Sequence, residues 1–169
     1  MSKRKGNYIK MSDLIDVVGH DVARFMFLMY SSTTHIEFDL SVALEKSERN
    51  PVYYLQYAFA RISSLLNQEE LVKIKKIKEI SLSEENELRL AVELFKWPEI
   101  LEEAALNNRV QLLPNYALDL ANRFHNFYDK CRVIDNGEVN NTRVALIKLT
   151  HKILLEVLTT IGVEAPERM

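Results

Sequence analysis

The chain has 169 residues, a length that suits one domain with a sizeable core, since 47% of its residues are hydrophobic. Its formal net charge of −2 lacks the basic excess of many nucleic-acid-binding proteins, and its single cysteine excludes an intrachain disulfide and a multi-cysteine zinc site. No apolar run approaches the ~20 residues that span a bilayer, and the N-terminus does not resemble a signal peptide, so we expect a cytoplasmic protein without a membrane segment.

The hydrophobic pattern predicts helices along most of the chain, because apolar residues recur every three or four positions and few glycines and prolines interrupt them. The Asn50-Pro51 pair is expected to begin a helix, Ser83 to cap another, and Gly162 to end the last one. Turn residues at 135–141 predict a loop. We therefore predict an all-α antiparallel helical bundle with a short helical lead-in. The predicted helices cover residues 12–18, 21–32, 42–48, 51–68, 85–95, 99–108, 114–134 and 143–161, and a short helix followed by a turn is predicted within 69–87.

Metal and thiol chemistry have little support in this pattern. The four histidines are scattered, with no pair at the i,i+4 spacing of metal ligands, so we expect no metal site. Cys131 falls on an apolar helical stripe, which favours a buried structural thiol over a nucleophile. The lysines between Lys73 and Lys78 are expected to form a solvated face, although RNA contact there stays open.

Two polar-aromatic stretches suggest RNA binding. Residues 53–61 contain three tyrosines and Phe59 beside Arg61, more aromatic side chains than one buried stripe needs, so at least one ring is expected off the core face. Tyrosine and arginine together form stacking platforms for unpaired bases, although core and helix–helix packing explains such rings equally well. The second stretch, RFHNFYDKCR at 123–132, places polar and aromatic side chains on a helix whose other side is apolar.

Six blocks, taken in order, resemble one family. MSKRKGN at residues 1–7 is similar to the K-M-S-K-S signature loop of class I aminoacyl-tRNA synthetases, without its first lysine and with Arg4 in place of the last serine. It is followed by GHDVARFMFLM, FDL, NPVYYLQYAFARI, RFHNFYDKCRV and GVEAPERM. Together these blocks resemble the C-terminal part of arginyl-tRNA synthetases over essentially all 169 residues. The related cysteinyl-tRNA synthetases are not expected to carry the NPVYYLQYA and APERM blocks.

The resemblance implies a two-part organisation and a partner. Residues 1–49 would form the signature loop and a helical connector, and residues 50–169 a helical anticodon-binding domain of the class I synthetase type. The implied partner is the anticodon stem and loop of arginine tRNA. The parent enzyme, an arginine–tRNA ligase, would attach arginine to its tRNA with ATP and magnesium. Its catalytic domain would precede Met1, so this chain alone is expected to be inactive, to bind no cofactor and to be a monomer.

The resemblance also assigns site residues at both ends of the chain. In such enzymes the signature loop closes over ATP, and its cations stabilise charge on the leaving pyrophosphate. Lys3 matches the second lysine of the motif, although any of Lys3, Arg4 and Lys5 could contact phosphate. The implied ATP contacts are Ser2, Lys3, Arg4, Lys5 and Gly6.

Tyr128 is the residue expected to stack on or read an anticodon base, with His125 and Arg132 about one turn away in support. Arg61 is instead expected to tie the tyrosine-rich helix to its neighbours. The implied tRNA contacts are Tyr128, His125, Arg132, Arg143, Arg168 and Met169, the last through its carboxylate.

A second class of function remains open from the residues alone. A helical protein–protein interaction module would use the tyrosines and Trp97 as interface anchors, and the sequence pI of 6.1 favours it slightly. A free-standing enzyme has no support, because the sequence contains neither a Rossmann glycine-rich turn nor a catalytic triad pattern.

Overall fold

A computed structural model describes residues 10–31, 33–74, 80–135 and 138–169 of the chain. Helices dominate these residues, which confirms the predicted all-α fold, and one short two-stranded ladder accompanies them. In chain order the elements are α1 (Met11–Val18), α2 (His20–Leu28), α3 (Leu40–Leu44), α4 (Pro51–Leu66), α5 (Glu69–Val72), α6 (Glu85–Phe95), α7 (Trp97–Asn107), α8 (Leu112–Lys130), β1 (Ile134–Asp135), β2 (Glu138–Val139) and α9 (Asn141–Ile161).

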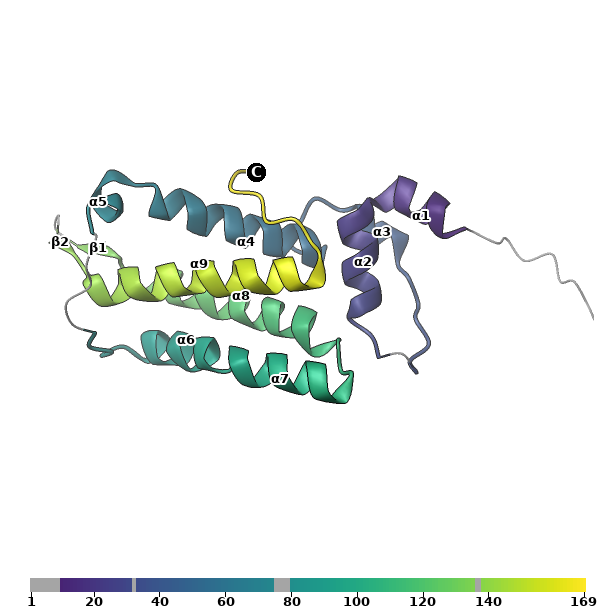
Figure 1. Cartoon of the computed structure of the whole chain (residues 1–169). Helices are drawn as coiled ribbons and strands as arrows, with labels where there is room; N and C mark the ends of the chain where they lie inside the picture. Colours follow the sequence, from purple (N-terminus) through teal and green to yellow (C-terminus); the bar gives the residue numbers. More distant parts are fainter. Residues whose placement is uncertain (1–9, 32, 75–79, 136–137) are drawn as a thin grey trace, which may run out of the picture.

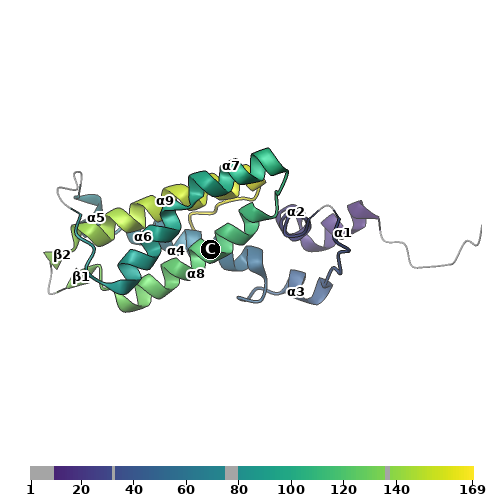
Figure 2. The ribbon, with the colours of Figure 1, turned by 90° about the horizontal axis from the view of Figure 1, so that it is seen from below.

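The long helices α4, α8 and α9 lie side by side, and α6 followed by α7 forms a further rod against α8 (Figure 1). Helices α4 and α8 run in one direction, whereas α6, α7 and α9 run in the other, so the bundle has the predicted antiparallel arrangement. The lead-in helices α1, α2 and α3 lie beyond one end of the bundle, as the view from below also shows (Figure 2).

Asn50 joins the lead-in to the bundle. Its Oδ1 accepts hydrogen bonds from the backbone amides of Val52 and Tyr53, which satisfies two of the free donors in the first turn of α4. Its Nδ2 donates to the carbonyl oxygens of Ala43, within α3, and of Glu45, just after it. The predicted helix start at Asn50 is therefore confirmed, and the same side chain that caps α4 also fixes the incoming chain.

The start of α6 differs from the prediction. Glu84, not Ser83, precedes the helix, and the Oε2 atom of Glu87 accepts hydrogen bonds from the amides of both residues. A glutamate in the first turn can reach back to these free N–H groups, so the Ser83 hydroxyl is not needed as a cap.

Trp97 marks the break between α6 and α7. Pro98 has no N–H to donate to the carbonyl of Leu94, so the two helices cannot continue as one. The Trp97 ring stacks on Tyr116 with 5.4 Å between centroids, and its Nε1 donates to Glu156. Because this side chain is buried, it does not serve as the exposed interface anchor that the alternative function required.

The described residues form two apolar clusters. The larger one fills the space between α4, α6, α8 and α9 and includes the fully buried rings of Phe25, Phe59, Phe124 and Phe127. The smaller one, in the lead-in, consists of Val18, Ala23 and Ala43 with partly buried neighbours. Phe25 of α2 reaches the larger cluster, so the lead-in packs on the bundle through apolar contact as well as through Asn50. The domain boundary at residue 50 stays a prediction.

The segment predicted as a loop at 135–141 is partly structured. Ile134 pairs with Val139 and Asp135 with Glu138 in an antiparallel ladder, which reverses the chain between α8 and α9.

Among the described residues, no helix is both long enough and apolar enough to cross a membrane.

Candidate nucleic-acid interface

Arg61 and Tyr128 form the centre of the candidate interface. The Arg61 guanidinium carbon, on α4, lies 4.7 Å from the centroid of the Tyr128 ring on α8, within range of a cation–π contact. The other neighbour of the ring is Phe124, one turn earlier on α8, at 5.9 Å between centroids. Phe124 is fully buried whereas Tyr128 is only half-buried, so the core holds one side of the tyrosine in place.

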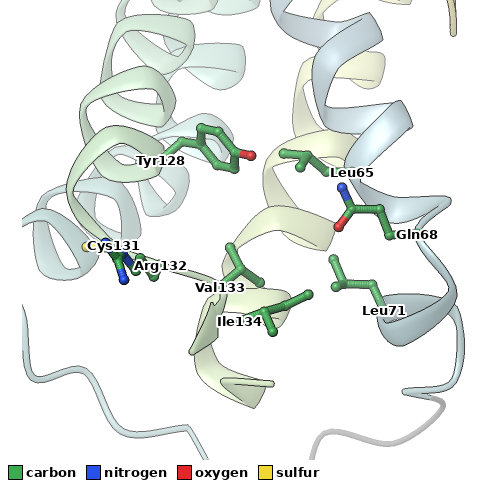
Figure 3. A pocket seen from close by; sticks show the side chains of 8 residues that line it. All are labelled: Leu65, Gln68, Leu71, Tyr128, Cys131, Arg132, Val133 and Ile134. Carbon is green, nitrogen blue, oxygen red and sulfur yellow. The ribbon is translucent and has the colours of Figure 1, made fainter. Parts of the chain in front are cut away.

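Tyr128 borders an open pocket of about 290 Å³ between the end of α4 and the chain that leaves α8. Figure 3 shows the ring of Tyr128 extending across the pocket toward Leu65 and Gln68. The walls combine apolar side chains with polar groups from Gln68, Arg132 and Tyr128. The pocket is lined by Leu65, Gln68, Leu71, Tyr128, Cys131, Arg132, Val133 and Ile134.

Arg61 borders a second open pocket, of about 400 Å³, on α4. After α9 the chain turns back over α4, and its last two residues help to line this pocket (Figure 1). Tyr57, one turn before Arg61, is 44% exposed, so one ring of the tyrosine-rich helix lies off the core face, as predicted. The lining residues are Tyr57, Ala60, Arg61, Ser64, Arg168 and Met169.

His125 lies between α4 and α8 rather than at the open surface of either pocket. Its ring is 5.2 Å from that of Tyr54, and its Nε2 atom is buried with no hydrogen-bond partner among the described residues. Burial lowers the pKa of His125, and the positive charge of Arg61 lowers it further. The ring is therefore neutral at pH 7 and packs between the two helices that carry Arg61 and Tyr128.

Arg143 is engaged inside the protein. Its Nε donates to Oε1 of Glu87 at 2.6 Å, and its Nη1 donates to the carbonyl oxygen of Arg132, also at 2.6 Å. Glu87 is 1% exposed, so this ion pair joins α6, α9 and the end of α8 within the bundle. A phosphate contact by Arg143 stays a prediction. The Arg132 side chain is instead 84% exposed, near Asp135.

The structure thus divides the predicted RNA contacts between two neighbouring places. Tyr128 and Arg132 line one pocket, and Arg168 and Met169 line the other. Arg61 connects the two pockets, although sequence reasoning gave it only a packing role. The sequence did contain a sign of a surface role for Arg61: it lies four residues after Tyr57, and residues four apart share one face of a helix.

A comparison with known families identifies the bundle. The sequence model for the DALR anticodon binding domain matches residues 55–169, which include both pockets and most of the bundle. The chain belongs to the DALR anticodon-binding domain family.

Similar proteins agree with this assignment of the DALR domain. The arginine–tRNA ligase of Salinibacter ruber is 43% identical over all of this chain, which spans 31% of the length of that ligase. The solved arginyl-tRNA synthetase of Thermus thermophilus matches 99% of this chain and 29% of its own, with a TM-score of 0.68 at 26% identity. The arginyl-tRNA synthetase of Plasmodium falciparum matches 95% of this chain and 29% of its own, with a TM-score of 0.74 at 21% identity, and supports the fold.

Two further predictions from the sequence concern the N-terminal loop and the cysteine. Ser2, Lys3, Arg4, Lys5 and Gly6, to which the resemblance assigns ATP contacts, lie outside the described residues. Cys131 of the DALR domain is 2% exposed, which confirms the predicted burial, and burial raises the pKa of its thiol.

The stability of the DALR domain is expected to fall as the pH drops below 6.5. Burial lowers the pKa of His125 and of His151 from the ordinary value of 6.5, the latter ring being stacked on Phe59. The unfolded chain therefore takes up protons at a higher pH than the folded chain. This contribution to stability is fully present above pH 6.5 and is lost as the pH falls through the lowered values. Urea unfolding between pH 7.5 and 5.5 measures it.

The matched variants for this pH dependence carry glutamine in place of histidine. A variant with both His125→Gln and His151→Gln should show a smaller loss of stability between pH 7.5 and 5.5 than the unmodified chain. His20→Gln, at an exposed position that begins α2, should keep the full loss. The same pH slope in all three proteins would contradict the assignment.

Proposed function

We propose that this chain binds the anticodon stem and loop of arginine tRNA, as part of an arginine–tRNA ligase that attaches arginine to its tRNA with ATP. The observation that carries the proposal is the Arg61–Tyr128 pair, which lies between two open pockets within a DALR domain. Arginine–tRNA ligases similar over the whole chain support the choice of tRNA.

Each part of this arrangement suits an unstacked loop base. Single-stranded bases are recognised when they turn out of their stack, lie on an aromatic ring or guanidinium, and present their edges to polar groups. Phe124 packs against the ring of Tyr128, and the guanidinium of Arg61 lies over that ring, where it offers a planar cationic surface. Gln68 and Ser64 supply polar groups in the adjoining pockets for base edges or the sugar.

Phosphate contacts are proposed for exposed cations around the pockets. Arg132 and Arg168 are both exposed, and each lines one of the two pockets. Neutralising phosphates with such side chains releases counterions, so binding should weaken as salt rises. The role of ATP and magnesium belongs to the whole enzyme, and no described residue is assigned to it.

Anisotropy titrations with labelled RNA stem-loops test the proposal. The chain is expected to bind the anticodon stem-loop of arginine tRNA more tightly than one from another tRNA, and both more weakly as salt rises from 50 to 200 mM. Tyr128→Ala should lose about 10-fold in affinity, since stacking on one ring contributes about 1–3 kcal/mol per base. Tyr128→Phe keeps the ring and should retain most of the binding.

A matched control for Tyr128 lies in the lead-in. Tyr30, two residues after the end of α2, is 37% exposed and borders neither pocket, so Tyr30→Ala should bind RNA as the unmodified chain does. Equal affinity for arginine and other stem-loops, together with no effect of Tyr128→Ala, would refute the proposed function.

A further inference from the structure

Three segments far apart in sequence meet at a single carboxylate. The Oδ2 atom of Asp21, on α2, accepts a hydrogen bond from the backbone amide of Glu164 and another from Nε2 of Gln56, on α4, each at 3.0 Å. Nε2 of Gln56 also donates to the carbonyl oxygen of Glu164 at 3.1 Å. The lead-in, the bundle and the segment after α9 are thus joined by a closed triangle of hydrogen bonds.

The hydrogen bonds of this triangle hold the backbone of Glu164 rather than its flexible side chain. A carboxylate oxygen can accept two hydrogen bonds, and the amide of Gln56 has two N–H groups, one for each acceptor. Both backbone polar groups of Glu164 therefore have a partner on a helix that is itself packed. Hydrogen bonds that involve an ionised group are also stronger than neutral ones.

A second contact holds the same segment against α2. Gly162 ends α9 with a φ of +69°, and a Cβ atom at this position would lie 2.8 Å from a guanidinium nitrogen of Arg24. Arg24 and Asp21 are three residues apart on α2, so one face of this helix contacts the chain twice as it leaves α9. Val163, between the two contacts, is 4% exposed.

The distance along α4 from Gln56 to the second pocket matches the length of chain that follows Glu164. Gln56 lies one to two turns before Arg61 and Ser64 on α4, a rise of about 8–12 Å along the helix. The five residues that follow Glu164 can span at most about 18 Å, so an end held at Gln56 can reach the second pocket but not much beyond it. The last two residues do line that pocket.

We propose that Asp21 and Gln56 are positioning residues for RNA recognition, which hold the backbone of Glu164 so that Arg168 and Met169 line the pocket beside Arg61. This inference rests on the proposed function of the Arg61–Tyr128 site and adds two residues that touch neither the RNA nor the pocket. A joint that only fastened the lead-in to the bundle would affect stability, whereas a positioning role affects the C-terminal segment and the RNA affinity.

Amide hydrogen exchange and RNA binding, measured on the full chain, separate these roles. Asp21→Leu removes the acceptor, and we expect exchange of the Glu164 amide to accelerate about 10-fold and the affinity for the arginine stem-loop to fall about 5-fold to 10-fold. Asp21→Asn keeps an oxygen that can accept both hydrogen bonds and should restore most of both values. Asp16→Leu, an exposed acidic position on α1, is the matched control and should change neither.

A second variant keeps the test decisive if Asp21→Leu does not fold. Gln56→Leu removes two of the three hydrogen bonds and leaves the one from Glu164 to Asp21, so a smaller change in the same direction is expected. Unchanged exchange at Glu164 in these variants would overturn the anchoring, and faster exchange with unchanged RNA affinity would overturn the role in recognition. If the unmodified chain binds no stem-loop, the proposed function fails with this role, while the exchange measurement still reports whether Asp21 holds the segment.

Discussion

Replacing Arg143 by methionine is expected to lower the free energy of unfolding by about 3–5 kcal/mol, because the change leaves the buried carboxylate of Glu87 without its cation. Burial raises the pKa of Glu87, but hydrogen bonds from Arg143 and from the amides of Ser83 and Glu84 outweigh it, and the pKa lies below its usual range. Without Arg143 that balance shifts toward the neutral acid, and the link between α6 and α9 is lost.

Urea unfolding at pH 7 measures the effect of Arg143→Met. Arg132→Met is the matched control, since that side chain is 84% exposed, and it should change stability by less than about 0.5 kcal/mol. A double variant with Glu87→Met and Arg143→Met should recover part of the loss, because no charge is then left buried. A single Arg143→Met variant as stable as the Arg132→Met control would show that the ion pair contributes little.

Arg61→Met is expected to weaken binding of the arginine stem-loop about 30-fold. The change removes the guanidinium that lies over Tyr128 and lines the second pocket, and a hydrogen bond from such a charged donor to RNA contributes about 1.5–3 kcal/mol. Arg61→Lys keeps the charge but loses the planar surface, so an intermediate affinity is expected.

A double-mutant cycle decides whether Arg61 and Tyr128 act as a pair. Because their side chains are in contact, the losses from Arg61→Met and Tyr128→Ala should sum to more than the loss of the double variant. Arg89→Met removes an exposed arginine on α6 that lines neither pocket and should leave the affinity unchanged. Strict additivity, or an equal loss with Arg89→Met, would count against a shared site.

The sequence predicted those features of the fold that depend on neighbouring residues. Asn50 caps α4 through its own side chain, and Gly162 ends α9 through its own backbone, so a few letters around each were enough. The start of α6 could be capped either by the Ser83 hydroxyl or by the carboxylate of Glu87, and the longer side chain of Glu87 accepts the hydrogen bonds. The spacing of hydrophobic residues indicated the helices but not the short ladder that pairs Ile134 with Val139 and Asp135 with Glu138.

Contacts between distant segments could not be read in the same way. The resemblance implied a tRNA contact for Arg143 but not its ion pair, because its partner Glu87 lies 56 residues earlier on a different helix. The contact of Arg61 with Tyr128 likewise depends on how α4 packs against α8, which brings the two side chains to the same level of the bundle. Several residues of the candidate site were named from the sequence, but which of them touch one another depends on helix packing.

The burial of Trp97 has a practical consequence. It is the only tryptophan in the chain, it is 6% exposed, and it lies on α7, across the bundle from α4 (Figure 1). Its fluorescence should therefore change when the bundle unfolds, yet stay nearly constant when an RNA without a fluorophore occupies the pockets beside Arg61. The chain thus contains its own optical reporter of folding, with which a variant that has lost RNA binding can be distinguished from one that has lost its structure.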